Sequence, residues 1–258
     1  MRFIGAAVTD VGIVKKVNQD SLTLKVAHSR WGDVCMAVIC DGLGGLSQGE
    51  VASGNVVLAF DQWFKNAFLS ATEDWTKESI QRAWEELVYS INTRIQDYAK
   101  RQGVELGTTL TAVLFLQDKY YVVHVGDCRL YEIDDDIRQI TKDHTLIEQE
   151  LDKGSISEDD ARMDGRRNVL LQCIGVTKNL QIDFLVEDIK PGACYLLCSD
   201  GFRHAIEQEE IYFFCSPRKC KTQEAMQVQL EKLTERNKQR GERDNISSIL
   251  LQVGKEEC

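Results

Sequence analysis

Short apolar runs rich in β-branched residues recur along the chain, and polar turns separate them. Such runs predict β-strands, which we place at residues 2–8, 21–26, 34–40, 109–116, 120–125, 129–133, 182–186, 195–198 and 246–253. Between residues 114 and 140 they follow one another with only tight turns between them. This spacing favours antiparallel meanders, because parallel strands would need crossover helices, and it disfavours a doubly wound nucleotide-binding sheet.

Between the third and fourth of these runs, the apolar spacing becomes helical. Apolar side chains recur every three or four positions at Ile80, Ala83, Trp84, Leu87, Val88, Ile91, Ile95 and Tyr98. Thr76 is placed as an N-cap, and Gly103 stands just past the end. The stripe predicts a helix that packs on the core by this face.

A second helical pair is expected near residues 207–214 and 223–238, just before the last strand. The pattern therefore predicts an α+β fold, in which helices pack outside antiparallel sheets. Only two prolines, Pro191 and Pro217, occur, and no linker-like or repetitive run interrupts the sequence. We expect residues 1–258 to form a single domain.

The balance of charge limits the classes of partner. The chain carries 31 Lys and Arg against 41 Asp and Glu, a net charge of −10. Nucleic-acid-binding domains usually show the opposite sign or a basic stripe, so no nucleic acid partner is expected. The short apolar run at the N-terminus is interrupted by Asp10. We therefore expect no signal peptide and no membrane association, and we place the protein in the cytoplasm.

The nine cysteines are an odd number, and Cys35, Cys40, Cys194 and Cys198 lie in strand-like apolar runs. Reduced thiols in the core are therefore expected in place of disulfides. No CxxC pair is present, so a structural zinc site is not expected.

Residues 38–50, VICDGLGGLSQGE, lead an apolar run into one aspartate and then four glycines. A P-loop requires a Lys followed by Ser or Thr after its last glycine, and a dinucleotide fingerprint requires a third glycine or an alanine where Ser47 stands. Neither phosphate-binding loop fits. The carboxylate of Asp41 is therefore the chemically informative group of this stretch.

Acidic residues beside a glycine or a turn residue recur at the ends of the predicted strands, at Asp20, Asp41, Asp127, Asp200 and Asp244. Any one of them alone is explained by a turn. Together they can converge at one edge of the sheets. Clusters of oxygen ligands suit hard divalent cations, Mg²⁺ or Mn²⁺, and a glycine beside the aspartate leaves room for the ion and its waters.

The motifs TDVGIVKKVNQDS, VICDGLGG, GTTLTAVLF, VVHVGDCRLY, ITKDHTL, LLCSDGF and ERDNISSILL resemble the metal-dependent protein phosphatases of the type 2C family, particularly the short bacterial forms. The resemblance implies a central antiparallel β-sandwich flanked by helices in four layers, α-β-β-α. It also implies hydrolysis of phosphoserine and phosphothreonine by a water that two Mn²⁺ or Mg²⁺ ions activate, without a covalent intermediate. Phosphorylated proteins, a cognate serine/threonine kinase and a monomeric state are expected with it.

The same resemblance implies a ligand set for the two core ions. Asp41 would bridge both ions, and the carbonyl of Gly42 would bind the second. Asp200 and Asp244 would hold the first.

Two further carboxylates belong to the implied site. Asp20 would reach the ions mainly through water, and Asp127 with Asp200 would form a weaker third-metal site. The residues expected to carry catalysis are Asp41, Asp200 and Lys15.

The sequence departs from the family pattern at three positions, and one further segment lies where the members of the family differ from one another. Lys15 stands where most members have an arginine that binds the substrate phosphate, and Lys16 is the alternative. Leu43 replaces a proposed proton donor of eukaryotic members, so the donor to the leaving group is unassigned. Cys128 replaces a serine, which is expected to weaken the third-metal site modestly. A variable flap is expected near residues 144–168, as a solvated loop with short helices.

Two of the histidines are expected to have structural roles. His144 is expected to make structural hydrogen bonds, and His124 to be packed inside a strand.

A catalytically weak pseudophosphatase that binds phosphoproteins is the alternative function, although retention of the acidic residues argues against it. A phosphodiesterase or nuclease with two metals would usually include histidine ligands, and none of the four histidines stands in a ligand-like pair.

Overall fold

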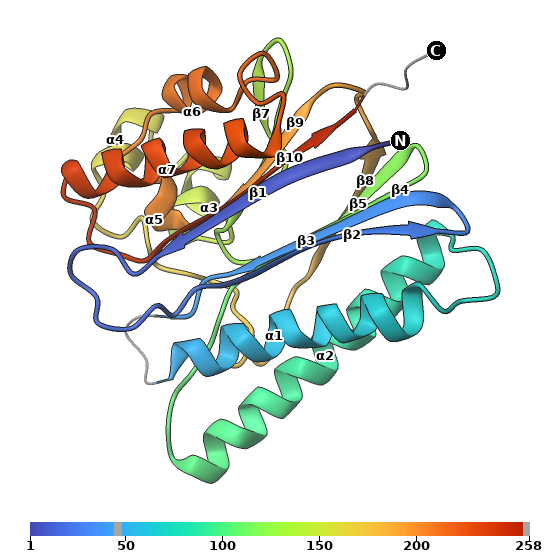
Figure 1. The fold of residues 1–258 in the computed structure, drawn as a ribbon. Helices are drawn as coiled ribbons and strands as arrows, with labels where there is room; N and C mark the ends of the chain where they lie inside the picture. The colour runs from blue at the N-terminus through green and yellow to red at the C-terminus, as the bar shows by residue number, and fades with distance from the viewer. Residues whose placement is uncertain (44–47, 255–258) are drawn as a thin grey trace.

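Two five-stranded antiparallel sheets lie face to face in the computed structural model, which describes residues 1–43 and 48–254 apart from the side chains of Arg162 and Met163 (Figure 1). The first sheet has the order β1-β10-β9-β6-β7 and contains β1 (Phe3–Asp10), β6 (Arg129–Ile133), β7 (Ile137–Gln139), β9 (Cys194–Cys198) and β10 (Ile246–Val253). The second has the order β2-β3-β4-β5-β8 and contains β2 (Ser21–Ser29), β3 (Gly32–Cys40), β4 (Leu110–Leu116), β5 (Lys119–Val125) and β8 (Asp183–Asp188).

Helices cover the outer face of each sheet. The face of the second sheet is covered by α1 (Gly49–Trp63), a short π-helix η1 (Phe64–Phe68) and α2 (Lys77–Gln102). The face of the first is covered by α5 (Asp200–Arg203), α6 (Gln208–Cys215) and α7 (Gln223–Gln239). The flap contains α3 (Leu146–Asp152) and α4 (Glu158–Met163). The expected α+β sandwich with helices outside, in four layers, is confirmed.

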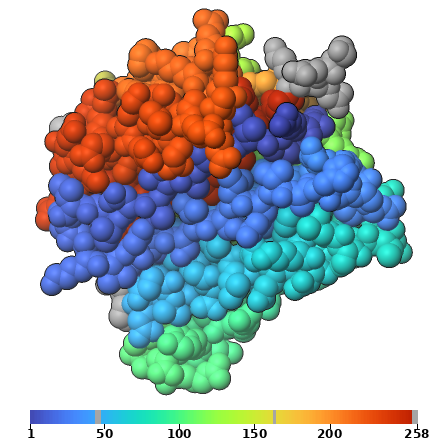
Figure 2. All heavy atoms as spheres, in the orientation of Figure 1, coloured from blue at the N-terminus to red at the C-terminus, as the bar shows by residue number. Residues whose placement is uncertain are grey.

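Strand β3 shows why the central strands have continuous apolar sequences. Alternate side chains of a strand point to opposite faces of the sheet. Met36 and Val38 pack against the helices, whereas Ala37 and Ile39 pack against the other sheet, and all four are fully buried. Three apolar layers therefore separate the four structural layers. In the space-filling view the N-terminal segments form a band between the C-terminal helices and the α1–α2 layer (Figure 2).

The predicted N-cap and C-terminal glycine of α2 are confirmed. The Thr76 side chain accepts a hydrogen bond from the Ser79 backbone N–H, and the Ser79 hydroxyl accepts one from Thr76 N–H, which forms a capping box. Gly103 ends the helix with a φ of 66°, a left-handed conformation that costs glycine little. Tyr98, included in the predicted apolar face, is instead exposed, and its hydroxyl lies 3.1 Å from Gln48 Oε1.

The expected meander across residues 114–140 is split between the two sheets. Strands β4 and β5 form a hairpin in one sheet, and β6 and β7 form a hairpin in the other. The chain changes sheets at residues 126–128, where Gly126 has a φ of +109° and a Cβ would lie 2.6 Å from Thr109 Cβ. The sequence showed a tight turn here but not that it leads away from the sheet. Asp127 consequently lies at the boundary between the two sheets.

The described thiols fit a further expectation. All described cysteines are free and buried, as predicted. None of the helices in the described ranges is both long enough and apolar enough to cross a bilayer.

Candidate functional site

Asp41 directly follows the last residue of β3, and neighbouring threonines fix its backbone. Its N–H donates to Thr109 Oγ1 at 2.9 Å, and its carbonyl accepts from Thr109 N–H and from the Thr108 hydroxyl, both at 2.9 Å. Thr109 Oγ1 also lies 3.1 Å from Cys128 Sγ. Cys128 therefore supports the threonine that holds Asp41, a contact that the sequence did not indicate.

Gly42 lies where two other backbone segments approach it closely. Its N–H donates to the carbonyl of Gln19 at 3.1 Å. A Cβ on this residue would lie 2.5 Å from that carbonyl oxygen and 2.6 Å from the carbonyl of Gly49. Any side chain here would push apart the loop that precedes β2 and the start of α1. Gly44 and Gly45 of the same motif lie outside the described residues.

The predicted carboxylates come from separate segments of both sheets. Asp20 immediately precedes β2, and Asp127 lies in the crossover between β5 and β6. Asp200 begins α5 two residues after the end of β9, and Asp244 lies just before β10. The negative charges of Asp20, Asp200 and Asp127 all act on Asp41, and those of Asp200 and Asp244 act on Asp20. The fold therefore brings the five side chains into one electrostatic cluster.

Burial and mutual repulsion raise the pKa values of three of these carboxyl groups. The pKa of Asp20 rises to about 7, mainly through burial and then through Asp200 and Asp244, with partial relief from the hydroxyls of Ser247 and Ser199. Burial and the charge of Asp200 likewise raise the pKa of Asp127 to about 7.

The effect is strongest at Asp41, whose pKa lies well above its usual value. Burial is the largest cause, followed by the charges of Asp20 and Asp200, and the carboxyl groups of Asp41 and Asp200 are close enough to share a hydrogen bond. Ionised carboxylates crowded together in this way are unstable without added positive charge.

Unpartnered oxygen atoms test whether the cluster suits a cation. Both carboxylate oxygens of Asp20 and Oδ1 of Asp200 are buried and have no hydrogen-bond partner of normal geometry. Buried polar atoms are almost always paired, so these oxygens fit divalent cations, which prefer oxygen ligands. As the side chains lie, no three His, Cys, Asp or Glu residues in the described ranges are arranged to hold one ion between them. The fit therefore rests on the donor chemistry and the unpaired charge, not on a complete coordination shell.

Lys15 lies beside this cluster, in an ion pair. Its Nζ is 3.0 Å from Asp244 Oδ1, and both side chains are partly exposed. Lys16, the alternative phosphate-binding residue, is exposed. Lys15 is thus the lysine that lies against a predicted metal ligand.

His144 makes structural hydrogen bonds, as expected. Its Nδ1 accepts from the Gly126 N–H at 3.2 Å, and its Nε2 lies 3.1 Å from Asp183 Oδ2. It thereby braces the crossover that carries Asp127. His124 is fully buried between Thr111 and the carbonyl of Lys142, also as expected.

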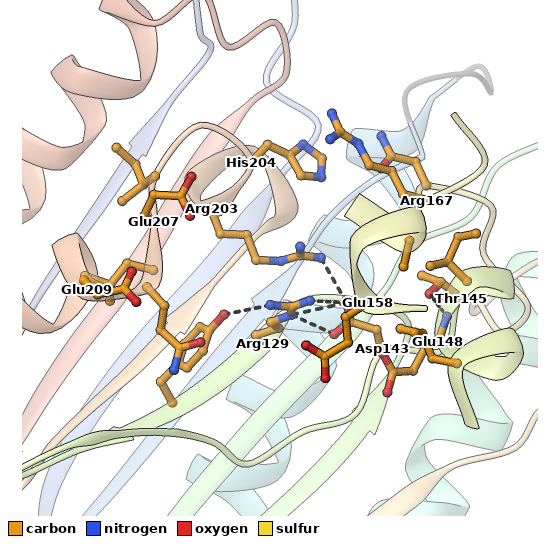
Figure 3. Close-up of a pocket in the computed structure, with 18 residues that line it drawn as sticks. Arg129, Asp143, Thr145, Glu148, Glu158, Arg167, Arg203, His204, Glu207 and Glu209 are labelled. Atoms are coloured by element: carbon orange, nitrogen blue, oxygen red, sulfur yellow. Dashed lines mark hydrogen bonds and ion pairs between the residues drawn. The ribbon is translucent and has the colours of Figure 1, made fainter. Parts of the chain in front are cut away.

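The sequence did not indicate that Arg203 contacts Asp127, one of the predicted metal ligands. Arg203 Nη2 donates to the carbonyl of Asp127 at 3.1 Å and to Asp143 Oδ2 at 3.2 Å, and it lies 3.6 Å from Asp127 Oδ2. Arg129 approaches the other side of the Asp143 carboxylate and also donates to the Tyr131 hydroxyl (Figure 3). The strong motif signals lay in the acidic residues, and nothing in the sequence indicated that these two arginines would meet.

The comparisons with known proteins agree with this geometry. The family model described as protein phosphatase 2C matches residues 13–235. The chain is 31% identical over 222 residues to the serine/threonine phosphatase stp of Listeria innocua, covering 84% of each chain. The structure superposes on the S. agalactiae serine/threonine phosphatase with a TM-score of 0.84 at 23% identity, covering 98% of this chain and all of that one. It also superposes on the catalytic domain of the serine/threonine protein phosphatase PstP in complex with two manganese ions, with a TM-score of 0.79 at 26% identity, covering 98% and 99% of the two chains.

Proposed function

The chain belongs to the type 2C family of protein phosphatases, and on this basis we propose that it hydrolyses phosphoserine and phosphothreonine in proteins with the help of Mn²⁺ or Mg²⁺. The observation that carries the proposal is the cluster of buried carboxylates around Asp41, with unpartnered oxygens on Asp20 and Asp200. Such a cluster is costly for a fold to keep unless cations offset its charge.

We assign the residues as follows. Asp41 and the carbonyl of Gly42 would hold the two core ions together with Asp200 and Asp244. Asp20 would act mainly through water. Asp127 with Asp200 would hold a weaker third ion, to which Cys128 would contribute little directly.

Bound cations would lower the pKa of water toward neutrality and offset charge on the phosphoryl oxygens. The chain's own residues would supply the positioning. Thr108 and Thr109 hold the backbone of Asp41 by three hydrogen bonds. Lys15 would bind a phosphoryl oxygen of the substrate. Leu43 carries no proton to donate, so it has no part in protonating the leaving group.

A covalent cysteine mechanism does not fit the thiols. Cys198 lies next to the acidic site but is fully buried, and burial raises its pKa to about 12. A thiol in this state is neither ionised nor reachable by a phosphoprotein. Direct attack by water is therefore the proposed route.

The experiment is phosphate release from a phosphothreonine peptide by the purified protein with Mn²⁺, with EDTA, and as the Asp41→Asn variant. Asp188→Asn is the matched control, because Asp188 is an exposed aspartate remote from the cluster. We expect turnover only with Mn²⁺ and only when Asp41 is intact. Turnover that persists in EDTA would contradict the proposal. Absence of turnover with retained metal binding would favour the pseudophosphatase alternative.

The setting of the protein is also proposed. We place it in the cytoplasm as a monomer, acting on proteins that a serine/threonine kinase has phosphorylated. Sedimentation of the purified protein tests the oligomeric state.

A further inference from the structure

A surface hollow of about 470 Å³ adjoins Lys15 and Asp244. Its other walls come from segments far apart in the sequence: Arg167 and Asn168 of the flap, His204 after α5, and residues 241–243 before β10. The hollow is therefore bordered both by two residues of the proposed site, Lys15 and Asp244, and by the end of the flap.

Most of the charged groups in this hollow are already paired. Lys15 is paired with Asp244 at 3.0 Å. The Glu242 carboxylate accepts the backbone N–H groups of Arg243 and Asp244 at 2.7 and 2.9 Å, and its other oxygen lies 3.8 Å from His204 Nδ1. The acidic groups of the hollow are thus turned to partners within the protein.

Two positively charged side chains of the hollow remain to be considered. The side chains of Arg167 and Arg243 are exposed, and neither forms an ion pair within the described part of the chain. In a protein with a net charge of −10, a hollow whose unpaired charges are both positive differs from its surroundings. The planar guanidinium group offers paired donors that match a carboxylate.

The neighbouring arginine of the flap shows the contrast. Arg166 donates to Glu150 at 3.0 Å and to Asp164 at 2.7 Å, so its charge is used inside the flap. Arg167 follows it in sequence but lacks such partners among the described residues. Arg167 is therefore the residue to test, and Arg166 is its matched control.

A second cavity, of about 660 Å³, shares Arg167, Asn168 and His204 with this hollow (Figure 3). Besides Arg167, it is lined by Arg129 and Arg203, which are both paired with Asp143. Glutamates dominate the rest of its charged lining. The two hollows thus share Arg167 but differ in the rest of their charged lining, and of the two the one next to Lys15 also contains Arg243.

We infer that the hollow formed by Arg167 and Arg243 binds acidic side chains of the substrate, and that the enzyme prefers phosphopeptides with glutamate or aspartate near the phosphorylated residue. The inference rests on the proposed function, since it uses the same site. It adds a substrate class and assigns two specificity residues outside the metal ligands.

The test compares two phosphothreonine peptides that differ only in flanking residues, glutamates in one and glutamines in the other. We expect a higher kcat/KM for the glutamate peptide. Arg167→Gln and Arg243→Gln should each lower the ratio of the two kcat/KM values about two- to fivefold, the range of an exposed ion pair. Arg166→Gln should leave the ratio unchanged. Because the measured quantity is a ratio, partial loss of folded enzyme does not affect it.

The inference is overturned if the wild-type ratio is one, if the glutamine peptide is preferred, or if Arg166→Gln lowers the ratio as much as the other variants. A protein without turnover would contradict the proposed function but not this inference. In that case, fluorescence anisotropy of the labelled, unphosphorylated peptides in EDTA decides. Tighter binding of the glutamate peptide that is lost in the Arg167→Gln/Arg243→Gln variant supports the hollow, and equal binding of both peptides overturns it.

Discussion

Lys15 Nζ lies 3.0 Å from Asp244 Oδ1, so the side chain proposed to bind the phosphoryl group is paired with a proposed metal ligand. A cation held by Asp244 would compete with Lys15 for the same carboxylate. Metal binding would then free the lysine to meet the substrate. With the proposed roles, binding of metal and binding of phosphate would be linked at this one ion pair.

We predict that Lys15→Ala raises KM for a phosphothreonine peptide about tenfold, because a charge-assisted hydrogen bond to the phosphoryl group is lost. Lys15→Arg should lower KM, since the planar guanidinium group of arginine can donate hydrogen bonds to two phosphoryl oxygens. Steady-state kinetics at saturating Mn²⁺ checks both. Lys16→Ala is the control, and a larger KM effect there than at Lys15 would transfer the role to Lys16.

Gly42→Ala should lower the unfolding free energy by about 2–3 kcal/mol, because the new Cβ would overlap the backbone of Gln19 and Gly49. The matched control is Gly54→Ala within α1, where the nearest atom is Ser21 Oγ at 3.8 Å. Alanine favours a helix over glycine, so this variant should gain about 0.5–1 kcal/mol. Urea denaturation measures both, and equal effects would refute the close approach at Gly42.

The metal-free protein should become less stable as the pH rises through 7. Asp20 and Asp127, with pKa values raised to about 7, hold protons in the folded state that the unfolded chain has already lost near pH 4. The folded state therefore binds more protons, and the unfolding free energy falls as these groups ionise. We expect a loss of about 1–2 kcal/mol between pH 6.5 and 8 in EDTA.

Mn²⁺ should reverse this dependence, because cations bind the ionised carboxylates and are favoured at higher pH. Asp20→Asn should make the profile in EDTA shallower, because asparagine does not titrate and Asp127 remains as the other titrating group. Denaturation at a series of pH values, with Mn²⁺ and with EDTA, makes the comparison. A stability that rises with pH in EDTA would mean that the carboxylates are not crowded as described.

Asp143→Ala should be strongly destabilising, by about 3–5 kcal/mol, because it leaves Arg129 and Arg203 in a buried setting without their shared anion. Burial alone would raise the pKa of Asp143, but the two arginines bring it below its usual value. Asp188→Ala removes an exposed partner of Lys119 and should cause no measurable change in thermal unfolding. Similar losses in the two variants would show that the Asp143 network is not a buried one.

Local signals predicted what depends on local structure. The N-cap at Thr76, the left-handed Gly103 and the alternation of β3 side chains between the two faces of the sheet follow from nearby residues, and so the helix and strands could be placed from sequence. The convergence of the five carboxylates was suggested by their positions at strand ends. The change of sheet at Gly126 could not be predicted, because a positive φ in a turn does not specify the direction of the next strand.

The pairings of charged residues also could not be predicted from the sequence. Arg203, Arg129 and Asp143 come from α5, β6 and the segment after β7, and they meet only when the first sheet has folded. The Lys15–Asp244 pair joins residues near the two ends of the sequence. Such contacts have no periodicity or spacing that a sequence pattern could reveal.

The crossover at residues 126–128 has a consequence for assembly of the site. Asp41 and Asp20 adjoin strands of the second sheet, Asp200 and Asp244 adjoin strands of the first, and Asp127 lies on the segment that connects them. With the proposed ligands, ions bound here would act as a cross-link between the two halves of the sandwich. Neither sheet alone carries the full set, so metal affinity would measure how completely the sheets have docked. Added Mn²⁺ would stabilise the docked state by a free energy that grows with the logarithm of one plus its free concentration over Kd.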